Sequence, residues 1–192
     1  KNDCELNAAK RLIPALVNPL AATHDLLITG DALYGNGPFI KLVQEQGHSF
    51  LITIKPGSQG SLFNQLQTLR AADATQTKER TKEHVLEHYE YANGLFLNGT
   101  YPDIKVNMVT YQKIDTRTGQ VLKTFDFMTN IPLNAGNVEK VVQAGRSRWK
   151  IENETFNTLK NQGYNYDHNY GHGHKHLATN FCILIFLAFL IN

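Results

Sequence analysis

Cysteine, net charge and long apolar runs are all scarce in this sequence of 192 residues. Its two cysteines, Cys4 and Cys182, form no CxxC pair and are too few for a disulfide framework, so we expect a reduced, cytoplasmic protein. The 19 Lys and Arg residues almost balance the 17 Asp and Glu residues, which excludes a histone-like polycation or an acidic tail. A local basic face that binds nucleic acid is still compatible with this total.

No apolar run is long enough for a membrane helix. The longest, from Cys182 to Ile191, has ten residues, whereas a spanning helix needs about 18–20. We therefore expect a buried helix at this end of the chain and no membrane partner. The sequence shows no secretory signal peptide and begins at Lys1 instead of Met, so we expect a fragment of a longer protein.

The first third of the sequence alternates helical and strand patterns. Residues 25–30 and 49–54 are short apolar runs that are rich in β-branched residues, which is typical of buried strands. Asp3 can cap the first helix, and Pro14 is expected to end or kink it. The helical patterns around these strands lie at 3–17, 39–46 and 62–72. This alternation predicts an α/β fold with a parallel strand pair.

The pattern changes after residue 75. Residues 75–83 are polar and predict a boundary. From 84 to 130 apolar and polar residues alternate around turns at Asn93-Gly94 and Thr118-Gly119, which predicts an antiparallel sheet of three or four strands. Helical periodicity then returns, with helices expected at 146–161 and from about residue 175.

These patterns predict one core that is interrupted by an insertion. The core is formed by residues 1–75 and 132–192. The β-rich insertion covers residues 76–131, and we expect it to be a separable unit.

Four charged side chains are candidates for a reaction site. Asp31 follows the first strand, at the end where α/β folds place their sites, although it could merely cap the next turn. Arg148 and Glu152 are four residues apart on one helix face, which also fits a simple surface ion pair. In an α-helix Lys160 would lie about 80° around from Glu152, still within reach of a long side chain.

The loop at 168–176 is rich in His, Asn and Gly, which raises the alternative of a metal-binding or membrane-associated protein. No cysteine is near, and Gly171 and Gly173 separate the histidines, so zinc is disfavoured. A polar loop that caps the last helix or touches DNA phosphate fits better.

Two stretches together resemble a known family. LLITGDALYGNGPFIKLVQEQGHSFLITIK (26–55) and the stretch from Arg148 to Leu190, which begins RWKIENETFNTLKNQGYNYDHNY, resemble the catalytic domain of DDE transposases of the IS4 type. Asp31 and Tyr34 match the family's D-x-x-Y setting. Arg148 and Glu152 match its Y-x2-R-x3-E-x6-K signature. The signature Tyr would fall at Gly145 and the signature Lys at Leu159, one place before Lys160.

The resemblance implies a ribonuclease-H-like core, incomplete at its N-terminus, with an inserted antiparallel β-sheet and C-terminal helices. It implies that Asp31 and Glu152 are catalytic and bind metal, while Arg148 and Lys160 bind DNA phosphate. The family's first catalytic Asp has no match in this chain, so we expect the chain alone to be inactive.

The resemblance also implies cofactor and partners. These are Mg²⁺, for which Mn²⁺ can substitute, transposon-end and target DNA, and a second copy of the protein in a homodimeric synaptic complex at the bacterial nucleoid. The expected function is Mg²⁺-dependent cleavage and strand transfer of insertion-sequence ends. The alternative is a catalytically dead, DNA-binding remnant of a truncated transposase.

Overall fold

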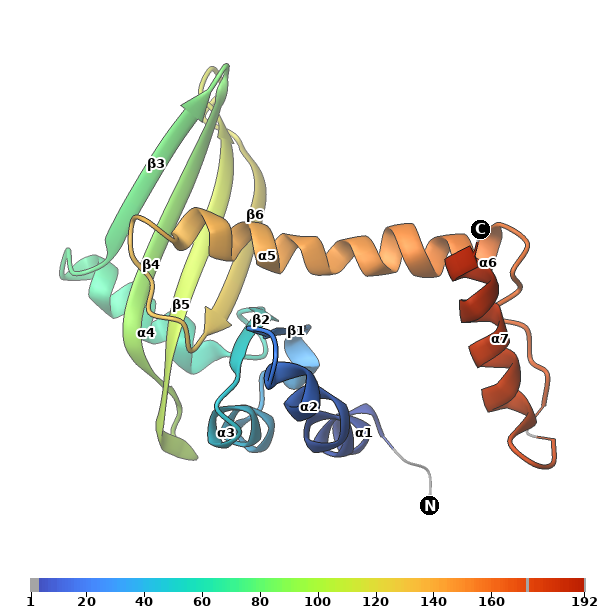
Figure 1. The fold of residues 1–192 in the computed structure, drawn as a ribbon. Coiled ribbons are helices and arrows are strands. Elements are labelled where there is room, and N and C mark those ends of the chain that lie inside the picture. The colour runs from blue at the N-terminus through green and yellow to red at the C-terminus, as the bar shows by residue number, and fades with distance from the viewer. Residues whose placement is uncertain (1–3, 172, 192) are drawn as a thin grey trace. The chain divides into compact units, whose positions relative to one another are not determined.

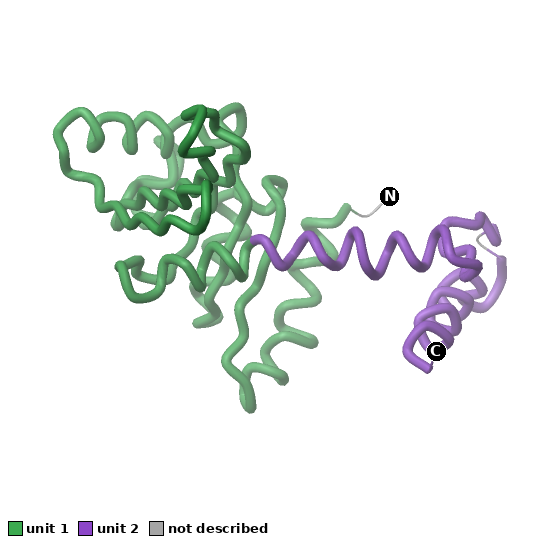
Figure 2. Tube along the Cα trace, turned by 90° about the horizontal axis from the view of Figure 1, so that it is seen from above, with its two compact units in different colours: residues 1–145 green, residues 146–192 purple. Residues whose placement is uncertain are grey.

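The computed structural model describes residues 4–171 and 173–191, so the expected cap at Asp3 lies outside the described residues. The chain forms two compact units, which Figure 2 colours separately: residues 1–145, the sheet unit, and residues 146–192, the helical unit.

The sheet unit is built on one six-stranded sheet, in the order β1-β2-β6-β5-β4-β3 (Figure 1). β1 and β2 pair in parallel, as predicted, and every other neighbouring pair is antiparallel. The strands are β1 (Leu27–Gly30), β2 (Ser49–Ile54), β3 (Gln76–Lys82), β4 (Val85–Asn98), β5 (Tyr101–Asp115) and β6 (Val121–Thr129).

Helices precede and connect the first strands. They are α1 (Glu5–Leu12), the π-helical turn η1 (Ile13–Val17), α2 (Asn18–Ala21), the 3-10 turn η2 (Ala32–Tyr34), α3 (Gly37–Glu45) and α4 (Gly60–Ala71). Pro14 does not end the first helix, because the π turn that contains it leads directly into α2. α3 begins where expected: Asn36 accepts a hydrogen bond from the Phe39 amide at 3.0 Å, and Pro38 occupies the first turn.

The core lies on both faces of the sheet. On one face, apolar residues of α3 and α4, such as Ile40 and Leu62, pack against Phe50 and Ile52 of β2. On the other face lies the start of α5 (Val138–Lys150), where Val141 and its neighbours join a cluster with the central strands. That cluster includes Leu51, Tyr89, Tyr91, Val109, Tyr111 and Phe127. The sheet unit is therefore a three-layer α/β/α arrangement.

The structure differs from the expectations for residues 75–98 at two points. The polar stretch expected as a boundary is strand β3, paired with β4 from Gln76 to Lys82, because hydrogen bonding to a neighbour does not require apolar side chains. Asn93-Gly94 is not a turn between strands but a bulge inside β4, where the pairing register shifts and Gly94 has a φ of +74°.

The four later strands also continue the sheet of the first two. Leu51 to Ile54 of β2 pair with Asp126 to Thr129 of β6. The observed sheet therefore joins segments that the sequence assigned to core and insertion, and the two lie in the same compact unit.

Beyond residue 145 the chain is helical. α5 runs directly into the π-helical turn η3 (Ile151–Phe156) and α6 (Asn157–Asn161), so the helix expected at 146–161 is part of a longer helical run that begins at Val138. α7 (Leu177–Ile191) follows the His-rich loop. The loop packs on α7 through rings, with Tyr170 stacked on Phe181 at a centroid distance of 4.5 Å.

The expectation of a buried last helix is only half correct. The helix forms, but no described residue of α7 is buried, and the side chain of Leu184 is 59% exposed. Within the described part of the chain, no helix combines the length and apolar character needed to cross a membrane.

Candidate functional site

Asp31 lies directly after β1, at the carboxyl end of the parallel strand pair. Its backbone is extended (φ −87°, ψ −175°), and its carboxylate accepts a hydrogen bond from the Leu33 amide at 3.0 Å. The capping role considered from sequence is therefore real. This hydrogen bond occupies one oxygen of an exposed carboxylate, which leaves the group accessible to solvent and to ligands.

A close contact fixes the turn that carries Asp31. Tyr34 folds back over the strand end, so a Cβ added at Gly30 would lie 2.9 Å from Ile52 Cδ1 and 3.1 Å from Tyr34 Cδ2. Partial burial and the negative charges of Glu5 and Asp31 raise the pKa of Tyr34. The close packing of Gly30 against Tyr34 thus fixes the turn that carries Asp31, and a side chain at position 30 would displace this turn.

The loop after β2 supports the same edge of the sheet. The side-chain amide of Gln59 donates a hydrogen bond to the carbonyl of Gly35, and this joins the loops that follow β1 and β2. Gln59 is buried. Nothing in the sequence pattern singles out this glutamine, because its contact depends on the tertiary pairing of two loops.

Arg148 and Glu152 form the second part of the candidate site, in the helical unit. Arg148 Nη1 lies 2.6 Å from Glu152 Oε1, so the i,i+4 contact expected from sequence is present. The side chain of Glu152 is 50% exposed. The guanidinium therefore neutralises a carboxylate that solvent can reach, and its planar fork also suits a phosphate.

Glu152 lies in a π-helical turn, where the sequence predicted regular α-helix. The Asn157 amide donates to the Glu152 carbonyl, five residues back. Turns of this type occur frequently at functional sites. Lys160 follows in α6 and is exposed, whereas Leu159 beside it is fully buried. The α-helical angle expected between Glu152 and Lys160 therefore does not apply.

Gly145 lies where the family signature has tyrosine. A Cβ at this position would lie 2.5 Å from Cε1 of Phe127, because α5 crosses the sheet in direct contact with that ring. The departure from the signature thus has a packing cause.

A polar cluster that sequence analysis missed lies on the α4 face of the sheet. Arg70 of α4 pairs with Glu90 of β4, which is 6% exposed, and the Thr110 hydroxyl donates to Asp126 at 2.7 Å. The hydrogen bond from Arg70 lowers the pKa of Glu90, whereas burial raises the pKa of Asp126. Each carboxylate already has a partner, so we interpret this cluster as structural.

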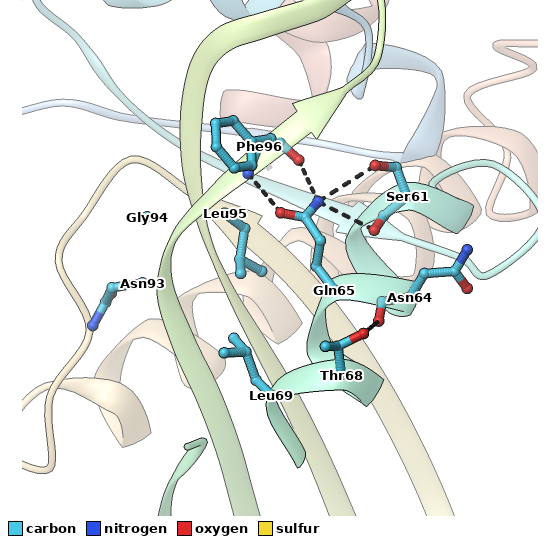
Figure 3. A pocket seen from close by; sticks show the side chains of 9 residues that line it. All are labelled: Ser61, Asn64, Gln65, Thr68, Leu69, Asn93, Gly94, Leu95 and Phe96. Carbon is cyan, nitrogen blue, oxygen red and sulfur yellow. Dashed lines mark hydrogen bonds between the residues drawn. The ribbon is translucent and has the colours of Figure 1, made fainter. Parts of the chain in front are cut away.

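A pocket of about 740 Å³ lies between α4 and the bulge of β4 (Figure 3). Gln65 closes one side of it, with its amide bonded to both the amide and the carbonyl of Phe96 at 3.0 and 2.8 Å. The nine residues that line the pocket include no acid, base or thiol, so no lining group can activate the hydroxyls of Ser61 and Thr68 for nucleophilic chemistry.

The donor chemistry of Asp31 and Glu152 fits a hard divalent cation, since carboxylate oxygens are the ligands that Mg²⁺ prefers. Asp31 belongs to the sheet unit and Glu152 to the helical unit. Among residues 4–171 and 173–191, no group of three His, Cys, Asp or Glu side chains is arranged to hold a metal ion. In the His-rich loop, the ring of His168 instead contacts that of Tyr170.

Comparison with known proteins gives one family. No curated protein matches the chain. The family described as "Transposase DDE domain" matches residues 5–191, which covers both units. This agrees with the resemblance carried by the stretches around Asp31 and Glu152, and the chain belongs to the DDE transposase domain family.

Proposed function

We propose that this chain is the larger part of the catalytic domain of an insertion-sequence transposase of the IS4 type. Its reaction would be Mg²⁺-dependent cleavage of the element's ends and their transfer into target DNA. The observation that carries the proposal is the family match over residues 5–191. The parallel pair β1–β2 with Asp31 at its carboxyl end supports a ribonuclease-H-like core, of which these strands would be the last two.

Asp31 and Glu152 are proposed as the metal-binding catalytic carboxylates. They would hold Mg²⁺, or Mn²⁺ in its place, which when bound activates the attacking oxygen and stabilises the leaving one. Their convergence is part of the proposal.

Arg148 and Lys160 are proposed to bind DNA phosphate. Arg148 pairs with Glu152 in the absence of DNA, so the fold does not leave that carboxylate uncompensated. A phosphate at the site would compete for the same guanidinium, which can form two parallel hydrogen bonds with it. Lys160 has an exposed side chain and would act as a point charge.

The proposed partners are two transposon ends, target DNA and a second copy of the protein, in the bacterial cytoplasm. DNA phosphates would replace the carboxylates that pair with basic side chains in the free protein. DNA binding should therefore weaken as the salt concentration rises.

The test is cleavage of a terminal-repeat substrate by the transposase that carries this chain. Glu152→Gln and Asp31→Asn should each abolish cleavage and leave DNA binding within about two-fold of wild type. Both changes keep side-chain volume, and loss of the Arg148 pair costs only about 0.3–0.5 kcal/mol. Glu154→Gln, in the same π turn, and Asp25→Asn, just before β1, are matched controls that should cleave normally.

Metal affinity provides a second readout. If the two carboxylates share a site, either substitution alone should remove Mn²⁺ binding measured by calorimetry, and neither control should. Wild-type cleavage by the Glu152 or Asp31 variant would remove that residue from the site. A wild-type protein that binds the ends but never cuts them would favour the DNA-binding remnant instead.

A further inference from the structure

The two faces of the outer sheet carry opposite charge. β3 to β6 extend beyond the helices that cover the core, and their side chains alternate between faces. On the face that α5 covers, Lys78, Arg80, Lys82, Lys113 and Lys123 are five cations against the three carboxylates of Glu87, Asp115 and Glu139. The opposite face carries Glu79, Glu90 and Asp126, with Arg70 as the cation that reaches it.

Contacts confirm the assignment of these faces. Lys78 Nζ lies 2.7 Å from a Glu139 oxygen of α5, and Lys113 Nζ lies 3.6 Å from Glu87. Glu87 also accepts a hydrogen bond from the Tyr111 hydroxyl, in the cluster beneath α5. Arg80 Nη1 also lies 3.4 Å from a Glu139 oxygen. The basic side chains therefore line the face on which α5 packs, and Lys78 and Arg80 contact the first turn of that helix.

One row of this face crosses four strands. Arg80 lies opposite Glu87, Glu87 opposite Lys113, and Lys113 opposite Lys123. With strands about 4.8 Å apart, the row spans roughly 14 Å. Duplex DNA carries one negative charge per about 1.7 Å of its axis, so a backbone lying along the row meets several phosphates.

The Lys113–Lys123 pair works against folding. Directly opposed side chains in an antiparallel pair have Cβ atoms about 4.5–5.5 Å apart, and like charges at this position destabilise the sheet. Glu87 compensates Lys113, but no ion pair joins Lys123 to an acidic side chain within residues 4–171 and 173–191. Local conflicts of this kind in an otherwise consistent fold are expected at functional or strained sites.

We propose that this basic sheet face, defined by Arg80, Lys82, Lys113 and Lys123, binds the phosphate backbone of DNA away from Asp31. The proposal rests on the proposed function in taking DNA as the polyanion. Charge complementarity supports it, and contacts to phosphate carry no sequence information, so we expect binding without sequence preference. The basic sheet face would bind flanking or target DNA, whereas the catalytic residues would bind the transposon ends.

The experiment uses a 30-base-pair duplex of arbitrary sequence, EDTA, and fluorescence anisotropy between 50 and 300 mM NaCl. Lys113→Gln/Lys123→Gln should lower the slope of log K against log salt by about 1.8, from about 0.9 per phosphate contact. At 0.1 M NaCl this corresponds to a loss in affinity of about 60-fold. Lys10→Gln/Lys41→Gln removes the same charge from α1 and α3, over the opposite face, and should leave the slope unchanged.

A single variant separates binding from folding. Lys123→Glu places an opposite charge across from Lys113, so the melting temperature should rise while DNA affinity falls further than with glutamine. An unchanged slope in the double variant, an equal loss in the Lys10/Lys41 control, or binding to anionic vesicles but not to duplex would overturn the proposal. EDTA removes the metal from the assay, so these outcomes are independent of cleavage. A wild-type salt slope in a double variant that still cleaves DNA would refute DNA binding by the basic sheet face and leave the proposed function intact.

Discussion

Replacing Gly145 by alanine tests how closely α5 packs on the sheet. The added Cβ would lie 2.5, 2.8 and 2.9 Å from three ring atoms of Phe127, well inside van der Waals contact. The ring has little room to yield, because Phe127 is 1% exposed and lies nearly parallel to Phe125, with an interplanar angle of 9°. Relief therefore requires α5 to shift from the sheet.

Two effects of opposite sign determine the result. Overpacking a well-filled core costs about 1–3 kcal/mol, and three close contacts with an immobile ring place Gly145→Ala in the upper part of that range. Alanine in a helix interior gains about 1 kcal/mol over glycine. The net loss should be about 1–2 kcal/mol, which for a unit of 145 residues lowers the melting temperature by about 2–8 °C.

The assay is thermal unfolding with a control and a rescue. Gly60→Ala lies at the start of α4 with nothing within 4 Å of the added Cβ, so it should be neutral or stabilising. Phe127→Leu makes room beneath α5, so the double variant should be more stable than the sum of the single effects predicts, by about 1 kcal/mol or more. A Gly145→Ala protein as stable as wild type would show that α5 does not contact Phe127 as described.

Two further predictions concern the α4 face of the sheet. Burial raises the pKa of Asp126, although the hydrogen bond from Thr110 opposes this shift. The protonated carboxyl therefore stabilises the fold. This stabilisation is fully present below the unfolded-state pKa of about 3.9 and is lost as the pH rises through the folded-state pKa. Asp126→Asn should therefore melt higher than wild type at pH 7, with the gap closing by pH 3.5; a constant gap would refute the charge argument. Gln65→Ala removes two hydrogen bonds to Phe96 and should cost about 1–2 kcal/mol in urea unfolding, whereas Asn64→Ala, one residue earlier, should be neutral.

The sequence patterns predicted the fold best where the burial of a segment agrees with its hydrophobic periodicity. β2 is found at Ser49–Ile54, as predicted, because an apolar run covered on both faces has few alternative structures. The parallel pairing of β1 with β2 followed from the intervening helix. β3 was missed because its side chains are almost all exposed, and its strand identity comes from pairing with β4.

The proposed site residues stand out in the sequence, whereas the contacts that support them do not. Asp31 and Glu152 stand out through motif spacing, and the Arg148–Glu152 contact follows from helix geometry. The bond between Gln59 and Gly35 depends on two loops meeting, and no local pattern encodes it. The same limit applies to the basic sheet face, which is visible only once the register sets Lys113 opposite Lys123.

The π turn at Glu152 gives a structural reason for the proposed role of Lys160, which stands one place later than the signature lysine. In an α-helix, seven residues turn the chain through about 700°, so residue i+7 returns to nearly the face of residue i. A π turn takes up one extra residue, and so Lys160, eight residues after Glu152, regains about the position that residue 159 would hold in a regular helix. The buried side chain of Leu159 provides an internal check, since a lysine there would point into the packed side of the helix. The altered spacing and the π turn therefore compensate each other, and together they support assigning Lys160 to the face that carries Glu152.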